Sequence, residues 1–96
     1  MAKQSLMRIE KNPSFNNKLF LILKYIAINN PTNAKQFKRE LDKKIYALVN
    51  MPFKYRQSIH YDDLNTRDLI FKGYTIPYII DNDVIVIIDI FKWEDK

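Results

Sequence analysis

The chain has 96 residues, of which 47% are hydrophobic and 28% charged, and its 16 basic and 11 acidic residues give a net charge of +5. This length predicts a single domain, residues 1–96, and this composition favours a folded globule over a disordered chain. The absence of cysteine excludes disulfides and thiolate metal sites, and one histidine cannot build a zinc site alone. We therefore expect no metal and no other cofactor.

Charge and hydropathy also limit the partners. The longest apolar run, Leu19 to Ile28, contains Lys24 and has about half the length of a membrane span. The first twelve residues carry charges and no apolar core, so we expect no signal peptide. These features predict a cytoplasmic protein with no membrane partner. The basic charge either favours an acidic partner, such as nucleic acid or an acidic protein segment, or only keeps the protein soluble.

The N-terminal half predicts a strand and a helix. A short first strand is expected at residues 6–9, and Ser14, after Asn12 and Pro13, is the expected N-cap of the helix. Apolar residues then follow at helical spacing from Phe15 to Ile28, and in the second half they lie on nearly every face. Because one sheet cannot cover all of these faces, we expect part of this helix to remain exposed.

A second helix is expected after a very short link. Asn30 suits its N-cap, and Pro31 suits its first position, where a missing N–H has no cost. Its apolar stripe consists of Ala34, Phe37, Leu41, Ile45 and Leu48. Two helices joined in this way predict an antiparallel hairpin.

The C-terminal part has the pattern of strands. Segments 67–71, 74–80 and 84–91 are rich in Ile, Val, Tyr and Phe, and residues 81–83 form the expected hairpin turn. Pro77 predicts an edge strand or an interrupted ladder. In the last strand, one face is expected to carry Val84, Val86, Ile88 and Ile90.

These elements predict an α+β fold in the order β-α-α-β-β-β. A short first strand precedes an antiparallel two-helix hairpin, which packs on a small, mainly antiparallel sheet. The residues expected to be buried between the layers are Phe37, Leu41, Ile45, Ile88 and Ile90.

Several local marks follow one another along the chain. They are YIAINNPTNA at residues 25–34, Leu48…Pro52…Arg56, Arg67-Asp68-Leu69, Gly73-Tyr74 and the closing hairpin through Ile90. With these marks in this order, residues 12–93 resemble the RelE/ParE superfamily of bacterial toxins from type II toxin–antitoxin systems. The resemblance implies a toxin that arrests growth when free and that forms a hetero-oligomer with its cognate antitoxin.

The resemblance leaves the target open. ParE-like members inhibit DNA gyrase by binding, whereas RelE-like members cut mRNA on the ribosome with basic residues and a terminal tyrosine or histidine. The resemblance places Thr75 and Trp93 at two of the basic positions, and no tyrosine or histidine follows Trp93. We therefore favour gyrase inhibition and no enzyme activity. Ribosome-dependent mRNA cleavage with non-standard residues is the alternative, and a non-toxic nucleic-acid-binding module is a further one.

If the chain is an endoribonuclease, its catalytic candidates are Arg67, His60 and Tyr74. Arg67 would stabilise the charge that develops on the phosphate, and His60 or Tyr74 would transfer a proton. Each also has a structural explanation: an ion pair with Asp63 or near Asp68 for Arg67, an exposed loop position for His60, and packing against the helices for Tyr74.

Two further sets of residues are candidates for binding. The candidates for contact with the target or with nucleic acid are Arg56, Arg67, Lys72, Lys92 and Trp93. The candidates for contact with the antitoxin are Leu21, Tyr25 and Ile28 on the first helix, in a helix-in-groove mode. An open sheet edge is expected to contribute to the same interface by strand addition.

Overall fold

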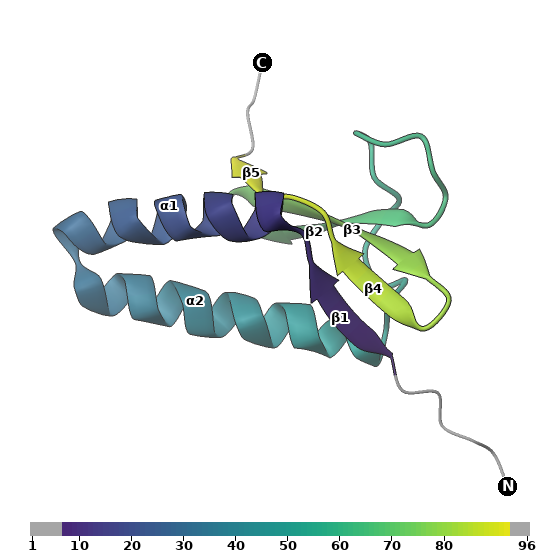
Figure 1. Cartoon of the computed structure of the whole chain (residues 1–96), viewed down its shortest axis with the longest axis horizontal. Coiled ribbons are helices and arrows are strands. Elements are labelled where there is room, and N and C mark those ends of the chain that lie inside the picture. Colours follow the sequence, from purple (N-terminus) through teal and green to yellow (C-terminus); the bar gives the residue numbers. More distant parts are fainter. Residues whose placement is uncertain (1–6, 93–96) are drawn as a thin grey trace, which may run out of the picture.

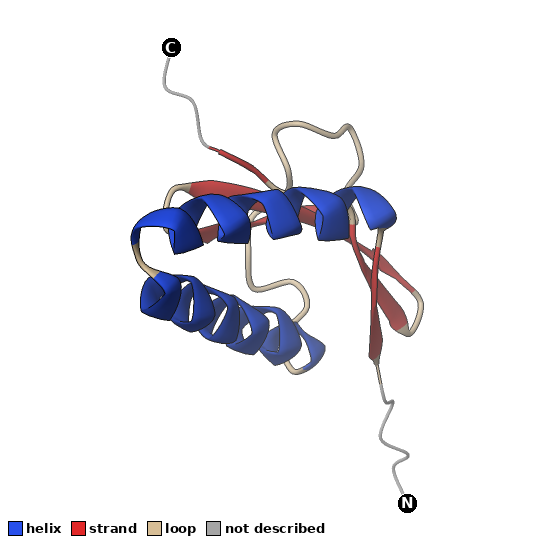
Figure 2. Cartoon of the chain, turned by 60° about the vertical axis from the view of Figure 1, so that its left-hand side comes forward, coloured by secondary structure: helices blue, strands red, loops and turns tan. Residues whose placement is uncertain are grey.

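The computed structural model describes residues 7–92 and confirms the α+β fold (Figure 1). Two helices form a hairpin over one face of a five-stranded, mostly antiparallel sheet (Figure 2). The elements are β1 (Arg8–Lys11), α1 (Pro13–Asn29), α2 (Pro31–Tyr46), the 3-10 helix η1 (Ala47–Val49), β2 (Thr66–Phe71), β3 (Tyr74–Asp81), β4 (Val84–Ile87) and β5 (Phe91–Lys92). The first strand therefore begins two residues later than expected, and residue 6 lies outside the described range.

The strand order is β1-β4-β3-β2, with β1 parallel to β4 and the other pairs antiparallel. β3 lies in the centre although it contains Pro77. Its ladder is interrupted there: β4 pairs with Tyr78–Asp81, and β5 pairs with Tyr74 and Thr75. Pro77 still accepts a hydrogen bond from the N–H of Ile88 at 2.9 Å. The predicted interruption of the ladder is therefore confirmed.

The predicted continuous strand over residues 84–91 is wrong. Ile87 faces Tyr78 and Phe91 faces Thr75, so four steps along one chain match three steps along the other. One extra residue is accommodated between β4 and β5, as in a β-bulge.

This extra residue changes which side chains face the core. Ile85, Ile87 and Ile90 are buried, whereas Ile88 is only partly buried. The prediction that Ile88 and Ile90 share one face is therefore wrong, because a one-residue shift moves a side chain to the other face. The last strands do pair, and Ile90 is buried as expected.

The helix ends follow proline and asparagine. α1 begins at Pro13 with Asn12 at the N-cap, so the prediction of Ser14 as N-cap is wrong; proline is favoured at the first helical position. The prediction for the second helix is confirmed. The side-chain oxygen of Asn30 accepts from the N–H of Asn33 at 3.1 Å, and Pro31 follows at the first position.

The core lies between α2 and the sheet. The stripe of α2 and η1 is buried as predicted: Ala34, Phe37, Leu41, Ile45 and Leu48. Phe37 packs edge-on against Phe71 and Tyr74, at centroid distances of 5.1 and 5.7 Å. α1 buries Phe15 and Leu19, and in its second half Ile22, Leu23 and Ile26 pack against the core while partly exposed. Within residues 7–92, no helix has the length and apolar character that crossing a membrane requires.

Candidate functional site

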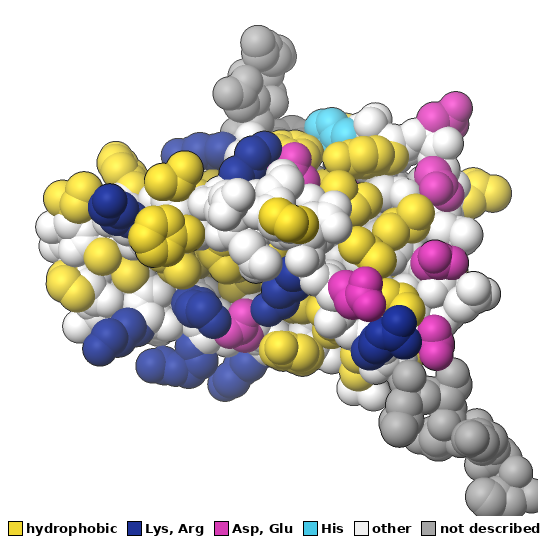
Figure 3. Space-filling model, viewed as in Figure 1, with side chains coloured by type: hydrophobic (Ala, Val, Ile, Leu, Met, Phe, Trp, Pro, Cys, Tyr) yellow, Lys and Arg dark blue, Asp and Glu magenta, His cyan; other side chains and the backbone are white. Residues whose placement is uncertain are grey.

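The exposed surface of α1 is the largest group of uncovered apolar side chains on the helical hairpin. This α1 patch consists of Phe20, Leu21, Tyr25 and Ile28, which are 63%, 61%, 70% and 76% exposed. Figure 3 shows hydrophobic side chains gathered over the left-hand half of the hairpin, with lysines and arginines around them. The expected exposure is therefore confirmed. That an antitoxin covers Leu21, Tyr25 and Ile28 stays a prediction.

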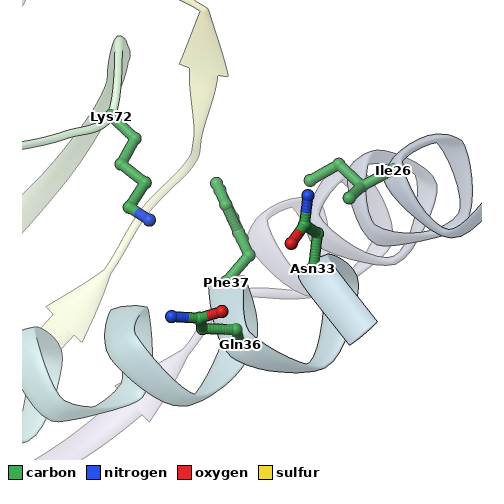
Figure 4. A pocket seen from close by; sticks show the side chains of 5 residues that line it. All are labelled: Ile26, Asn33, Gln36, Phe37 and Lys72. Atoms are coloured by element: carbon green, nitrogen blue, oxygen red, sulfur yellow. The ribbon is translucent and has the colours of Figure 1, made fainter. Parts of the chain in front are cut away.

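A pocket of about 280 Å³ lies between the tip of the hairpin and the β2–β3 turn (Figure 4). It is lined by Ile26, Asn33, Gln36, Phe37 and Lys72. Figure 4 shows Lys72 reaching from the turn toward α2. The polar groups of Lys72 and Gln36 both bond to the carboxylate of Glu40, at 2.9 and 3.1 Å. The pocket lining therefore combines the apolar side chains of Ile26 and Phe37 with polar groups, and the charge of Lys72 is paired with Glu40.

The hydrogen bonds from Lys72 and Gln36 hold the pKa of the Glu40 carboxyl below its usual value. Lys72 itself has a φ of +49° in the turn, a conformation that lysine rarely adopts. This predicted target-binding residue is therefore already engaged within the chain.

The structure does not bring the candidate catalytic residues together. The ring of Tyr74 packs on Phe37, so it lies on the helix-covered face of the sheet. The ring of His60 packs edge-on against Phe91 at 5.0 Å, and Phe91 is the partner of Thr75. Because neighbouring residues in a strand point to opposite faces, His60 and Tyr74 lie on opposite sides of the sheet.

Arg67 is held by the segment that precedes β2. Its Nη1 donates to the carbonyl oxygen of Tyr55 at 3.1 Å, and its guanidinium lies over the ring of Phe53 at 4.8 Å. No ion pair joins it to Asp63 or Asp68. The expectation of such a pair is wrong, because the partner of the guanidinium is a backbone carbonyl.

The position after Gly73 and Tyr74 is closed to a ligand. Thr75 is 1% exposed, and its hydroxyl has no hydrogen-bond partner within residues 7–92. Tyr78 is fully buried and donates to the carbonyl oxygen of Pro52 at 2.7 Å, and burial raises its pKa to about 12. Neither group is placed for proton transfer to a substrate near pH 7.

The target-binding candidates form two separate groups. Arg56 is exposed, and its backbone lies beside β2, because Gln57 bridges to Arg67. Lys72 is at the far end of β2, five residues from Arg67, or about 16 Å along the strand. Lys92 is the partner of Tyr74 at the same end as Lys72. Trp93 lies outside the described residues.

Sequence reasoning missed how the chain covers part of its own sheet edge. Ser58 donates to the carbonyl oxygen of Thr66 at 2.7 Å, and Asp68 donates from its N–H to the carbonyl oxygen of Arg56 at 3.2 Å. In an antiparallel strand, every second residue directs its N–H and C=O away from the partner strand, so after Thr66 and Asp68 the next residue of β2 to do so is Ile70. It has no partner strand within residues 7–92. The open edge is therefore short.

Asp68 also escaped notice as a buried carboxylate. Its side chain is 1% exposed; Oδ2 accepts from the N–H of Ile59 at 3.4 Å, and Oδ1 has no partner in the described part of the chain. This contact fastens residues 56–61 over the sheet. The only sequence signal that pointed to Asp68 was its place in the motif Arg67-Asp68-Leu69.

Comparison with known proteins agrees with this architecture. A family model described as the ParE toxin of the type II toxin-antitoxin system, parDE, matches residues 9–95. Among solved structures, the chain is similar to one from the chromosomal ParDE TA system from P. aeruginosa, with a TM-score of 0.76 and 15% identity. The alignment covers 95% of this chain and 100% of that chain, and at this identity it shows the fold alone. No curated protein sequence matches this chain.

Proposed function

This chain belongs to the ParE toxin family of type II toxin–antitoxin systems, and we propose that it arrests growth by binding DNA gyrase, without cutting RNA. In this proposal the toxin acts in the cytoplasm, and a cognate antitoxin neutralises it in a hetero-oligomer. The family is established by the match over residues 9–95, whereas the target is our inference.

The separation of the candidate catalytic groups is the observation that carries the proposal. Cleavage by attack of a 2′-hydroxyl needs positive charge and two proton-transfer groups around one phosphate. His60 and Tyr74 contact rings on opposite faces of the sheet, so they cannot reach one phosphate together. Arg67 pairs with Tyr78, which is four residues along β3 from Tyr74. Arg67 and Tyr74 are therefore separated by about 13 Å along the strands. This arrangement supports binding over cleavage.

The antitoxin is proposed to cover the α1 patch and the open part of the β2 edge. A soluble monomer rarely exposes four large apolar side chains on one helix, and a partner helix would bury them. Among residues 7–92, no strand pairs with the outward-facing N–H and C=O of Ile70, which are open to an added strand. The pocket beside Ile26 would receive a side chain of the docked helix.

The test is induced expression in a bacterial host, followed by parallel assays of protein synthesis and plasmid supercoiling. We expect growth to stop, plasmid supercoiling to fall first, and pulse-labelled protein synthesis to continue at that time. Co-expression of the antitoxin encoded beside the toxin should restore growth. Immediate loss of protein synthesis with unchanged supercoiling would favour the ribosome as the target and contradict the proposal.

A further inference from the structure

A second concave surface lies where α2 ends and the segment after η1 begins. Two adjoining depressions of about 360 and 230 Å³ share Lys44, Ala47 and Lys54. We name this surface the lysine trough; its lining includes Lys43, Lys44, Ala47, Met51, Lys54, Tyr55 and Phe71. Met51 is 61% exposed, so apolar surface remains open to solvent there.

Three lysines of the trough have no ion pair within residues 7–92. No carboxylate in this range lies within 4.0 Å of the ammonium groups of Lys43, Lys44 or Lys54. Glu40, which also lines the trough, is paired with Lys72 at 2.9 Å. Three unpaired cations around an apolar floor favour a ligand with both carboxylates and apolar side chains.

The aromatic rings argue against a nucleic acid. Lys54 lies over Tyr55 at 5.5 Å, and Tyr55 packs edge-on against Tyr78 at 6.5 Å. Phe71 is 5% exposed and packs against Phe37. Bases bind single-strand sites by stacking on free ring faces, whereas Lys54 lies over the Tyr55 ring and Phe71 is almost wholly buried.

We propose that the lysine trough binds an acidic, apolar, extended segment of a protein partner. The segment belongs to the antitoxin, an assignment that rests on the proposed function. Continuity supports this partner: Phe71 lines the trough, and the adjacent Ile70 is 44% exposed with its backbone groups facing outward. A strand that pairs with Ile70 would place its carboxylates beside Lys44 and Lys54.

The test uses the full chain and a fluorescein-labelled peptide of alternating leucine and glutamate. Fluorescence anisotropy measures its affinity for the parent, for Lys44→Glu/Lys54→Glu, and for the control Lys24→Glu/Lys35→Glu. Both control lysines are exposed, lie on the helical hairpin outside the trough and have no ion pair in the described chain. The two double variants change the net charge equally, and circular dichroism confirms that each is folded.

We expect the trough variant to weaken binding by about tenfold or more and the control by about twofold or less. A peptide with glutamine in place of glutamate should bind the parent chain more weakly than the acidic peptide does, by a similar factor. Equal losses in both double variants, equal binding of the glutamine peptide, or displacement of the acidic peptide by single-stranded DNA would overturn the proposal. Gyrase inhibition by the same proteins is measured separately. If the peptide assay fails while gyrase is still inhibited, the proposed role of the lysine trough is rejected and the proposed toxin function stands.

Discussion

Asp89, in the bulge between β4 and β5, lies 3.0 Å from the ammonium group of Lys18 in α1. The same carboxylate accepts from the hydroxyl of Ser14 at 3.3 Å and from the N–H of Ile90 at 2.8 Å. It therefore joins the sheet to the first turns of α1, where the helix dipole also favours a negative charge.

We predict that Asp89→Asn lowers the free energy of unfolding by about 1 kcal/mol, because several hydrogen bonds to a charged group weaken together. For a domain of this size, the loss corresponds to a fall in Tm of about 4–8 °C. Thermal unfolding followed by circular dichroism measures it. Asp62→Asn, in an exposed loop, removes the same charge and should leave Tm almost unchanged. Equal shifts in the two variants would mean that the contact contributes nothing.

The raised pKa of Tyr78 predicts that the fold loses stability at alkaline pH. Burial raises its pKa to about 12 in the folded chain, against about 10 in the unfolded chain. The unfolded state therefore loses the proton first, so this stabilisation is complete below pH 10 and disappears between about pH 10 and 12. Urea unfolding across this pH range should show the decline. Tyr78→Phe should flatten it and cost about 1 kcal/mol at pH 7, while the exposed Tyr25→Phe should retain it.

The sequence predicted those parts of the fold that depend on local chemistry. The stripe of Phe37, Leu41 and Ile45 marked the buried face of α2, and Asn30 and Pro31 marked its start. It did not predict the bulge after Ile87, because the bulge is visible only in the contacts of Ile87 with Tyr78 and of Phe91 with Thr75, which join residues distant along the chain. Periodicity carries no information about such contacts.

Substitution of Gly73 should lower the stability of the fold through backbone strain alone. Its φ is +83°, and a Cβ at this position would meet no atom within 4 Å. With Lys72 at +49°, both central residues of the β2–β3 turn have positive φ, as in a type I′ turn. Gly73→Ala should lower the free energy of unfolding by about 1 kcal/mol, and Gly73→Asn by less, since asparagine tolerates this conformation. Urea denaturation ranks the two; equal stabilities would show that the turn does not restrain φ.

Leu21→Glu tests the proposed antitoxin surface. Leu21 is 61% exposed, so a charge there should change the stability of the free toxin by less than about 0.5 kcal/mol. In the complex it would be buried without a partner, and we expect the Kd to rise by about tenfold or more. Calorimetric titration with the cognate antitoxin measures this, with Gln57→Glu in an exposed loop as the control. Unchanged affinity of the Leu21 variant requires another interface.

The candidate site was less predictable than the fold. The exposure of Leu21, Tyr25 and Ile28 followed from the excess of apolar residues on one helix. The separation of His60 from Tyr74 did not, because it depends on which face residues 56–61 cover. That loop is fastened by the buried Asp68, whose partner Ile59 is nine residues away in the sequence. Sequence spacing alone could not assign these side chains to faces.

The central claim is that this toxin binds gyrase and performs no cleavage. The most direct measurement adds the purified protein to DNA gyrase in an ATP-dependent supercoiling assay and, in parallel, to translating ribosomes with a defined mRNA. We predict inhibition of supercoiling that the antitoxin reverses, and intact mRNA. Efficient codon-dependent cleavage that Arg67→Ala or His60→Ala abolishes, together with unimpaired supercoiling, would contradict the claim.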